Sequence, residues 1–122
     1  MEETIFDSEG NATAYISYHD ESTIYLWNGT PVAYLDTENR IYGFNGKHLG
    51  WYEDGIVWNL QGERNGFNRK SLRVFPKFEP FKAFRQFKPF KAFKQFSKFK
   101  PFKKMTTSNT SLQQFLFNGK RQ

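Results

Sequence analysis

The feature that most constrains this chain is a short unit that occurs four times between residues 5 and 67. Each copy begins with an isoleucine, continues to a glycine, and has a small residue four positions later with an aromatic residue next. The copies begin at Ile5, Ile24, Ile41 and Ile56, and the fourth has one extra residue before its glycine. A unit this short cannot bury its own apolar face, so the four copies must pack against one another.

Each copy has the pattern of a β-hairpin. β-Branched and aromatic residues precede a glycine that can adopt a positive φ, and a second run returns from it. Asn28-Gly29 and Asn45-Gly46 predict type I′ turns. A small residue in each return strand indicates a close approach of neighbouring groups, and these residues are Ala14, Ala33, Gly50 and Gly66. The structural turn residues are expected at Gly10, Gly29, Gly46 and Gly62.

The predicted fold class is all-β, with four sequential β-hairpins forming a small pseudo-four-fold barrel. A lone hairpin is only marginally stable in water, so the four must share a core, and closure also hides the strand edges. Twelve aromatic residues among residues 1–70 can supply that core, although they could instead form a platform that stacks on bases or sugars. The expected structural core residues are Tyr15, Tyr34, Trp51 and Phe67.

A basic tail follows, with Phe at every third position from Phe75 to Phe102. Neither an α-helix nor a strand gathers residues spaced by three on one face, whereas polyproline II does, and three prolines favour it. The spacing predicts an extended rod of roughly 80 Å with Phe on one edge and Lys on the others. A flexible linker is the alternative. An apolar stripe of this size must pack on the β module, on other tails, or against a partner or bilayer.

Charge divides the chain in the same way. Residues 1–70 hold 5 Lys/Arg against 11 Asp/Glu, and residues 71–122 hold 13 against 1. The two parts therefore attract each other, or the basic part meets an anionic partner. We expect a four-hairpin β module at 1–70, a Phe/Lys/Pro triplet tail at 71–104, and at 105–122 a polar linker with a short apolar patch. That patch is either a docking peptide or a frayed terminus, and it comprises Leu112, Phe115, Leu116 and Phe117.

Two hairpin segments and the tail carry a family resemblance. IYLWNGTPVAYLD at 24–36 and IYGFNGKHLGWYEDG at 41–55, followed by a triplet tail of the Phe-Lys-Pro type, resemble the bacterial four-fold β flower proteins. The resemblance covers nearly the whole chain. It implies a shallow four-petalled barrel of hairpins and a family without an assigned activity.

The residues do not form a convincing catalytic or metal site. His19 and His48 lie far apart without a repeated partner, and the acidic residues fall in connectors, where they are ordinary. Phosphate loops, nucleophile elbows and dinucleotide fingerprints are missing, so we expect no enzyme and no cofactor. There is no cysteine, and the acidic start Met1–Asn11 lacks an apolar run, which favours a cytoplasmic location.

Three binding hypotheses follow. The first is an interaction module whose β scaffold carries the tail to a protein partner or to another copy. The second is peripheral attachment to an anionic membrane, because Lys attracts lipid headgroups and Phe inserts. The third, less favoured, is nonspecific single-stranded nucleic-acid binding, in which Phe stacks on bases. The candidate partner-binding residues are Phe81, Phe84, Phe87, Phe90, Phe93, Phe96, Lys82, Lys88, Lys91 and Lys94.

Overall fold

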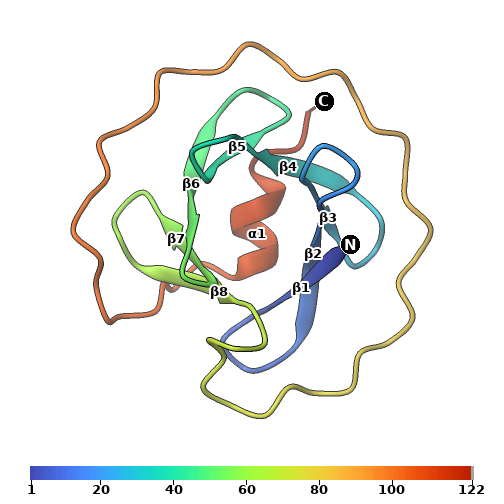
Figure 1. Ribbon diagram of the computed structural model, residues 1–122, viewed down its shortest axis with the longest axis vertical. Helices are drawn as coiled ribbons and strands as arrows, with labels where there is room; N and C mark the ends of the chain where they lie inside the picture. The colour runs from blue at the N-terminus through green and yellow to red at the C-terminus, as the bar shows by residue number, and fades with distance from the viewer. Residues whose placement is uncertain (122) are drawn as a thin grey trace.

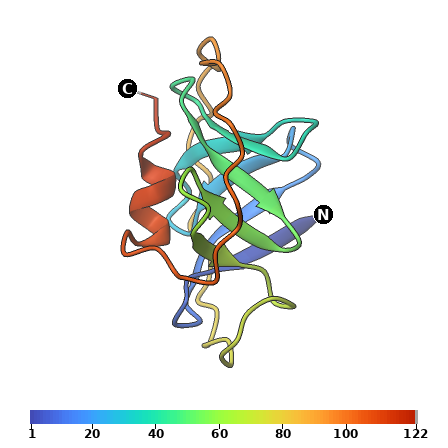
Figure 2. The same ribbon diagram turned by 90° about the vertical axis from the view of Figure 1, so that its left-hand side faces the viewer.

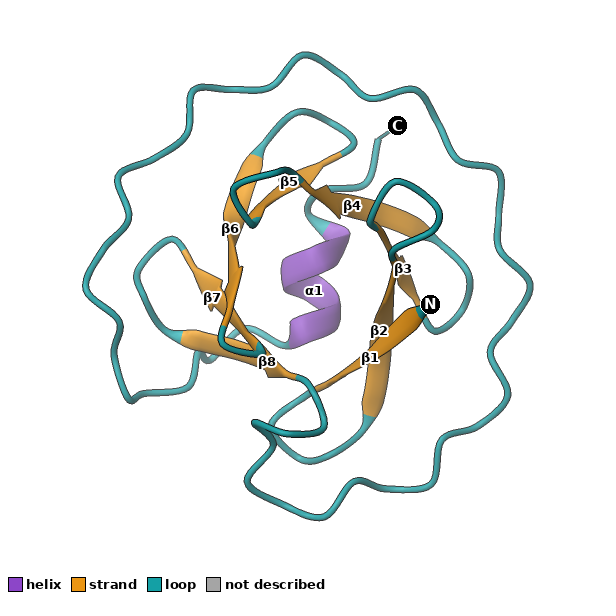
Figure 3. Cartoon of the chain, viewed as in Figure 1, coloured by secondary structure: helices purple, strands orange, loops and turns teal. Residues whose placement is uncertain are grey.

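The computed structural model describes residues 1–121 and shows a closed barrel in which each strand pairs antiparallel with the next (Figures 1 and 3). Phe6 opposite Phe67 closes the ring between the first strand and the last. The predicted barrel of four sequential hairpins is therefore confirmed. Its strands are β1 (Glu2–Phe6), β2 (Ala12–Ser17), β3 (Thr23–Leu26), β4 (Pro31–Leu35), β5 (Arg40–Gly43), β6 (His48–Glu53), β7 (Ile56–Asn59) and β8 (Arg64–Phe67).

The four hairpin turns share one geometry, and it is not the predicted type I′. In the second hairpin the Gly29 amide donates to the Leu26 carbonyl, and the Leu26 amide donates to the Thr30 carbonyl. Gly29 has a φ of +93°, while Asn28 is not among the residues with positive φ. A type I′ turn needs positive φ at both central residues, so the Asn-Gly prediction is wrong. Each loop is instead a tight turn that ends on a left-handed glycine next to a β-bulge.

The fourth copy contains no insertion. Val57 pairs with Gly66 as Ile24 pairs with Ala33, so Val57 rather than Ile56 is the equivalent of the first residue of the other copies. From Val57 the glycine follows after five positions, as it does in every other copy. The apparent extra residue came from aligning isoleucine with isoleucine, although either β-branched residue fills this position.

The barrel interior is aliphatic, and most of the aromatic residues lie outside it. Ile5, Ile24 and Ile41 belong to one buried interior cluster, while Tyr25 and Tyr42, their neighbours along the strands, do not. Side chains alternate across a strand, so one face of each strand points inward and the other outward. The expected core residues Tyr15, Tyr34, Trp51 and Phe67 are all buried, but on the outward face. There they form a second apolar layer.

The apolar patch near the C-terminus is neither frayed nor free to dock elsewhere. It forms helix α1 (Leu112–Phe117), with Ser111 as its N-cap, and it covers one end of the barrel (Figures 1 and 2). Leu112, Phe115 and Leu116 join the interior cluster. The small residues of the return strands make room for this helix. A Cβ on Gly66 would lie 2.9 Å from the Leu112 side chain.

Residues 75–104, which we call the belt, encircle the barrel nearly once (Figure 1). Seen from the side, the belt runs around the outside of the strands, while α1 sits at one end (Figure 2). It contains neither helix nor strand. The straight rod predicted from the triplet spacing is therefore wrong in shape, because contacts with all four hairpins bend the extended chain around the barrel.

Candidate functional site

The belt is attached to the turn glycines at intervals of nine residues. The amides of Lys77, Gln86, Gln95 and Lys104 donate to the carbonyls of Gly10, Gly29, Gly46 and Gly62, in that order, at 2.8–2.9 Å. Between these points the Ala83 and Ala92 amides donate to the carbonyls of Trp27 and Phe44. All these donors occupy the second position after a Phe. The same position is proline where the belt donates no backbone hydrogen bond to the barrel, at Pro80, Pro89 and Pro101. The missing N–H of these prolines therefore removes no contact.

The glycines also let the belt approach closely. A Cβ on Gly29 would lie 2.0 Å from the Phe84 carbonyl oxygen, and one on Gly46 would lie 2.1 Å from that of Phe93. Any larger residue at these turns would push the belt outward. The turn glycines therefore have two roles, since their backbone takes a positive φ and their missing side chain leaves room for the belt.

The first position after most Phe residues is a cation that faces the barrel. Lys82 lies 4.3 Å from the Tyr15 ring centroid, and Lys91 lies 4.2 Å from that of Tyr34. Arg85 lies 4.7 Å from the centroid of Tyr25. Cations over aromatic faces contribute about 0.5–1 kcal/mol each at exposed sites and more when desolvated. The outward aromatic layer of the barrel is therefore the surface on which the belt cations rest.

Carboxylates of the barrel complete these contacts. Lys88 Nζ lies 2.6 Å from Asp20, Lys94 lies 3.5 Å from Asp36, and Lys103 lies 3.0 Å from Glu53. Hydrogen bonds from Lys100 and Lys103 hold the pKa of Glu53 below its usual range. The acidic and basic parts of the chain thus attract each other within one molecule, which the charge division had predicted as one of two alternatives.

The ten Phe side chains of the belt, which we call the rim, all point to solvent. Their exposed fractions run from 89% at Phe78 to 102% at Phe81. With three residues per turn, an extended chain that turns one side toward the barrel must turn every third side chain away from it. Packing of the Phe stripe on the β module, one of the alternatives predicted from the sequence, is therefore wrong.

The candidate partner-binding residues divide into two groups. Phe81, Phe84, Phe87, Phe90, Phe93 and Phe96 belong to the rim and point outward. Lys82, Lys88, Lys91 and Lys94 instead contact aromatic rings or carboxylates of the barrel. The first group offers an apolar surface to a partner, whereas the second holds the belt in place.

The nine-residue repeat of the belt was present in the sequence but was not recognised there. Residues 75–83, 84–92 and 93–101 read FPKFEPFKA, FRQFKPFKA and FKQFSKFKP. Each nonapeptide spans the distance from one hairpin turn to the next. Gln86 and Gln95, nine positions apart, were the signal that could have linked the belt to the hairpin repeat.

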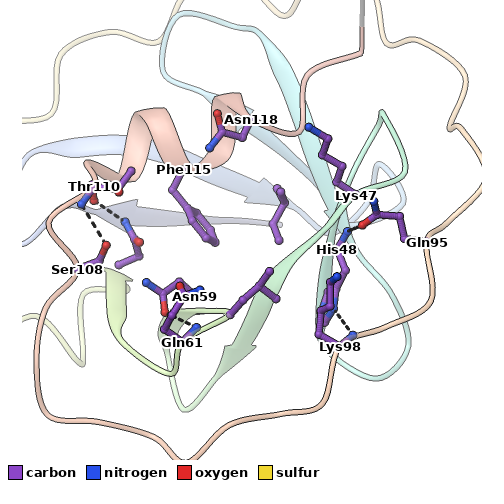
Figure 4. Close-up of a pocket in the computed structure, with 13 residues that line it drawn as sticks. Lys47, His48, Asn59, Gln61, Gln95, Lys98, Ser108, Thr110, Phe115 and Asn118 are labelled. Carbon is purple, nitrogen blue, oxygen red and sulfur yellow. Dashed lines mark hydrogen bonds between the residues drawn. The ribbon is translucent and has the colours of Figure 1, made fainter.

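A cleft of about 610 Å³ lies beside α1, over the turns of the third and fourth hairpins (Figure 4). Phe115 points into it, and Lys47, Lys98 and Asn59 line it. Its histidine is used internally, because His48 Nε2 lies 3.0 Å from the Gly50 carbonyl and Nδ1 accepts from the Lys98 amide at 2.9 Å. Burial lowers the pKa of His48, and Nδ1 carries no proton because it accepts the Lys98 amide. The cleft lining contains no carboxylate and no pairing of a nucleophile with a free base.

A family comparison now agrees with this geometry. The family model described as 4-fold beta flower protein matches residues 3–116. The chain belongs to this family. The matched β flower region includes the whole belt and most of α1, so the resemblance predicted from the hairpin motifs is confirmed. Searches of curated proteins and of solved structures give no match.

Within residues 1–121, no group of three or more His, Cys, Asp or Glu side chains could hold a metal ion. No helix in the described part of this β flower chain is long and apolar enough to cross a bilayer. The rim, with its ten exposed Phe side chains, is the candidate functional surface that the arrangement presents most clearly.

Proposed function

We propose that this β flower chain is a non-enzymatic docking module, in which the barrel is a scaffold and the rim binds a protein partner. The observation that carries the proposal is the orientation of the belt. Ten Phe side chains point to solvent, while the cations next to them are turned inward. The cytoplasmic location expected from the sequence stays part of the proposal.

The outward Phe side chains do not stabilise a single chain. Burying apolar area stabilises by about 25 cal/mol per Å², so a belt that only stabilised the barrel would place Phe inward. Exposed positions such as Phe87 and Phe90 would then carry polar residues. The belt has the reverse arrangement, which supports a rim built for contact with something outside the molecule.

This geometry is less suited to binding an anionic partner. The cations that would attract lipid headgroups or phosphates lie against carboxylates, as Arg85 does at 2.7 Å from Glu2 and Lys88 at 2.9 Å from Glu21. Electrostatic attraction to a membrane or a nucleic acid depends on cations that remain free to approach the surface. The pairing of these cations within the molecule therefore favours a protein partner over the other two.

Photo-crosslinking tests the proposal. The phenylalanine analogue p-benzoylphenylalanine would replace Phe87 in the full chain, expressed in the cells of its native host and irradiated there. Phe87 is 94% exposed, so the analogue should fit without disturbing the fold. We expect crosslinked products of discrete protein mass. The matched control places the analogue at the exposed connector residue Thr37, which should not give those products.

The outcomes separate the three classes of partner. A protein adduct specific to the Phe87 position, including an adduct with another copy of this chain, supports docking through the rim. Crosslinks to lipid or nucleic acid alone would overturn the proposal in favour of one of the other hypotheses. An identical pattern from the Thr37 position, or no adduct from Phe87, would also overturn it.

A further inference from the structure

We infer that the protein partner of the rim is further copies of the same chain, which associate edge to edge. This inference rests on the proposed docking function and names its partner. It depends on three properties of the rim: the apolar area that the rim exposes, its regular spacing, and its convex shape. Each property is set by the ten Phe and by the belt that holds them.

The apolar area exceeds what one ordinary interface covers. A Phe side chain can bury about 150–250 Å², so ten fully exposed Phe offer roughly 1,500–2,500 Å². The largest apolar patch on a typical monomer is only about 300–600 Å². A standard interface buries about 800 Å² on each partner, so the rim has room for about two or more neighbours. Association through the rim should therefore continue beyond a dimer.

The regular spacing of the rim matches a second copy of itself. Three residues of polyproline II advance about 9 Å, which is the interval between successive Phe side chains. A ring inserted midway between two of them would lie about 5 Å from each, within the favoured 4.5–7 Å range for aromatic pairs. A surface with the same interval can interdigitate where two edges meet, and the rim of another copy has that same interval. The three nonapeptides present similar arcs, so one contact can recur around the barrel.

The shape of the rim argues against a bilayer as the main partner. The belt that carries the rim is a single segment of chain around a round body (Figures 1 and 2), whereas the hydrocarbon core of a bilayer is about 30 Å thick. A flat membrane would touch only the part of the row nearest to it, and most of the Phe would stay in water. Several neighbouring copies around the edge can cover more of the row at once.

Salt distinguishes self-association from binding to an anion. The chain carries a net charge of +6, so copies repel one another at low ionic strength, and added salt screens that repulsion. Apolar contacts are not screened, so self-association should increase with salt. Binding to nucleic acid or to anionic lipid should instead weaken as salt rises.

The experiment is sedimentation velocity of the full-length chain at low and high sodium chloride, over a range of micromolar concentrations. We expect reversible oligomers larger than a dimer, whose proportion rises with both concentration and salt. In one variant, Phe78, Phe84, Phe90 and Phe96 are replaced by Ser, which doubles the interval between rings from Phe75 to Phe99 to about 19 Å and should leave a monomer. The same four positions replaced by Leu keep apolar area and should retain part of the association.

Near-ultraviolet circular dichroism of the aromatic layer checks that each variant keeps its belt in place. A wild-type chain that stays monomeric or stops at a dimer, or aggregates that do not dissolve on dilution, would overturn the inference. So would a Ser variant that associates as strongly as the wild type. If the chain is monomeric while its Phe87 position still crosslinks to another protein, docking stands and only self-association fails.

Discussion

Replacing Gly46 by Ala should loosen the belt at its centre. Gly46 has a φ of +88°, where an L-residue costs roughly 1–2 kcal/mol. Its new Cβ would lie 2.1 Å from the Phe93 carbonyl oxygen, which is backbone and must move by about 1 Å to reach an ordinary contact distance. That shift strains the 2.8 Å hydrogen bond from the Gln95 amide to Gly46, which contributes about 1 kcal/mol.

The sum is a loss of roughly 2–4 kcal/mol in the free energy of unfolding, once the weakened contact of Lys94 with the Tyr42 ring is included. Gly10→Ala is the matched control. Gly10 has the same turn and a φ of +89°, but its Cβ would lie 2.7 Å from the Phe75 carbonyl oxygen, where the belt begins and can yield more easily. The backbone strain cancels between the two variants, so the difference of about 1–2 kcal/mol measures the belt.

Urea unfolding followed by tryptophan fluorescence gives both free energies. Limited trypsin digestion under native conditions gives an independent measure, because Lys94 and Lys98 lie on either side of the Gln95 attachment. We expect Gly46→Ala to be cleaved there faster than Gly10→Ala. Equal stability losses together with equal cleavage rates would refute the conclusion that the missing side chain of Gly46 makes room for the belt.

Two further predictions concern the buried helix residue Leu116 and the buried histidine His48. Leu116→Ala should lower the free energy of unfolding by about 2–5 kcal/mol, because Leu116 is 1% exposed at the end of the barrel. The control is Phe117→Ala at an exposed position, which should lower that free energy by less than about 1 kcal/mol in the same urea titration. The free energy of unfolding should also fall as the pH drops below about 6.5. His48 becomes protonated there in the unfolded chain, whereas burial keeps its pKa in the folded chain below that value. His48→Gln should flatten the profile between about pH 7 and pH 5, and an equally steep profile in that variant would contradict the assignment.

Local signals were sufficient to predict the hairpins and the closed barrel. Each copy repeats the same two spacings, from the first β-branched residue to the turn glycine and from that glycine to a small residue, as in Gly29 and Ala33 of the second copy. The spacings repeat because every hairpin needs the same turn and the same inward small residue. The triplet spacing of Phe likewise predicted an extended chain with one apolar edge, because three residues per turn is a property of the backbone alone. The prediction of type I′ turns was wrong because Asn-Gly also suits a tight turn that ends on a left-handed glycine.

The direction in which each layer faces depends on contacts between distant parts of the chain. Tyr15 and Ile16 are both apolar neighbours on one strand, and alternation does not say which of them points inward. Two distant parts of the chain set the direction of these side chains. Helix α1 fills the interior beside the aliphatic residues, and the belt cations cover the outward rings. The repeats, the charges and the period of the tail can be read from the residues alone. The path of the belt around the barrel, and with it the outward rim, follows from contacts between residues more than forty positions apart, such as the Trp27 indole with the Pro80 carbonyl.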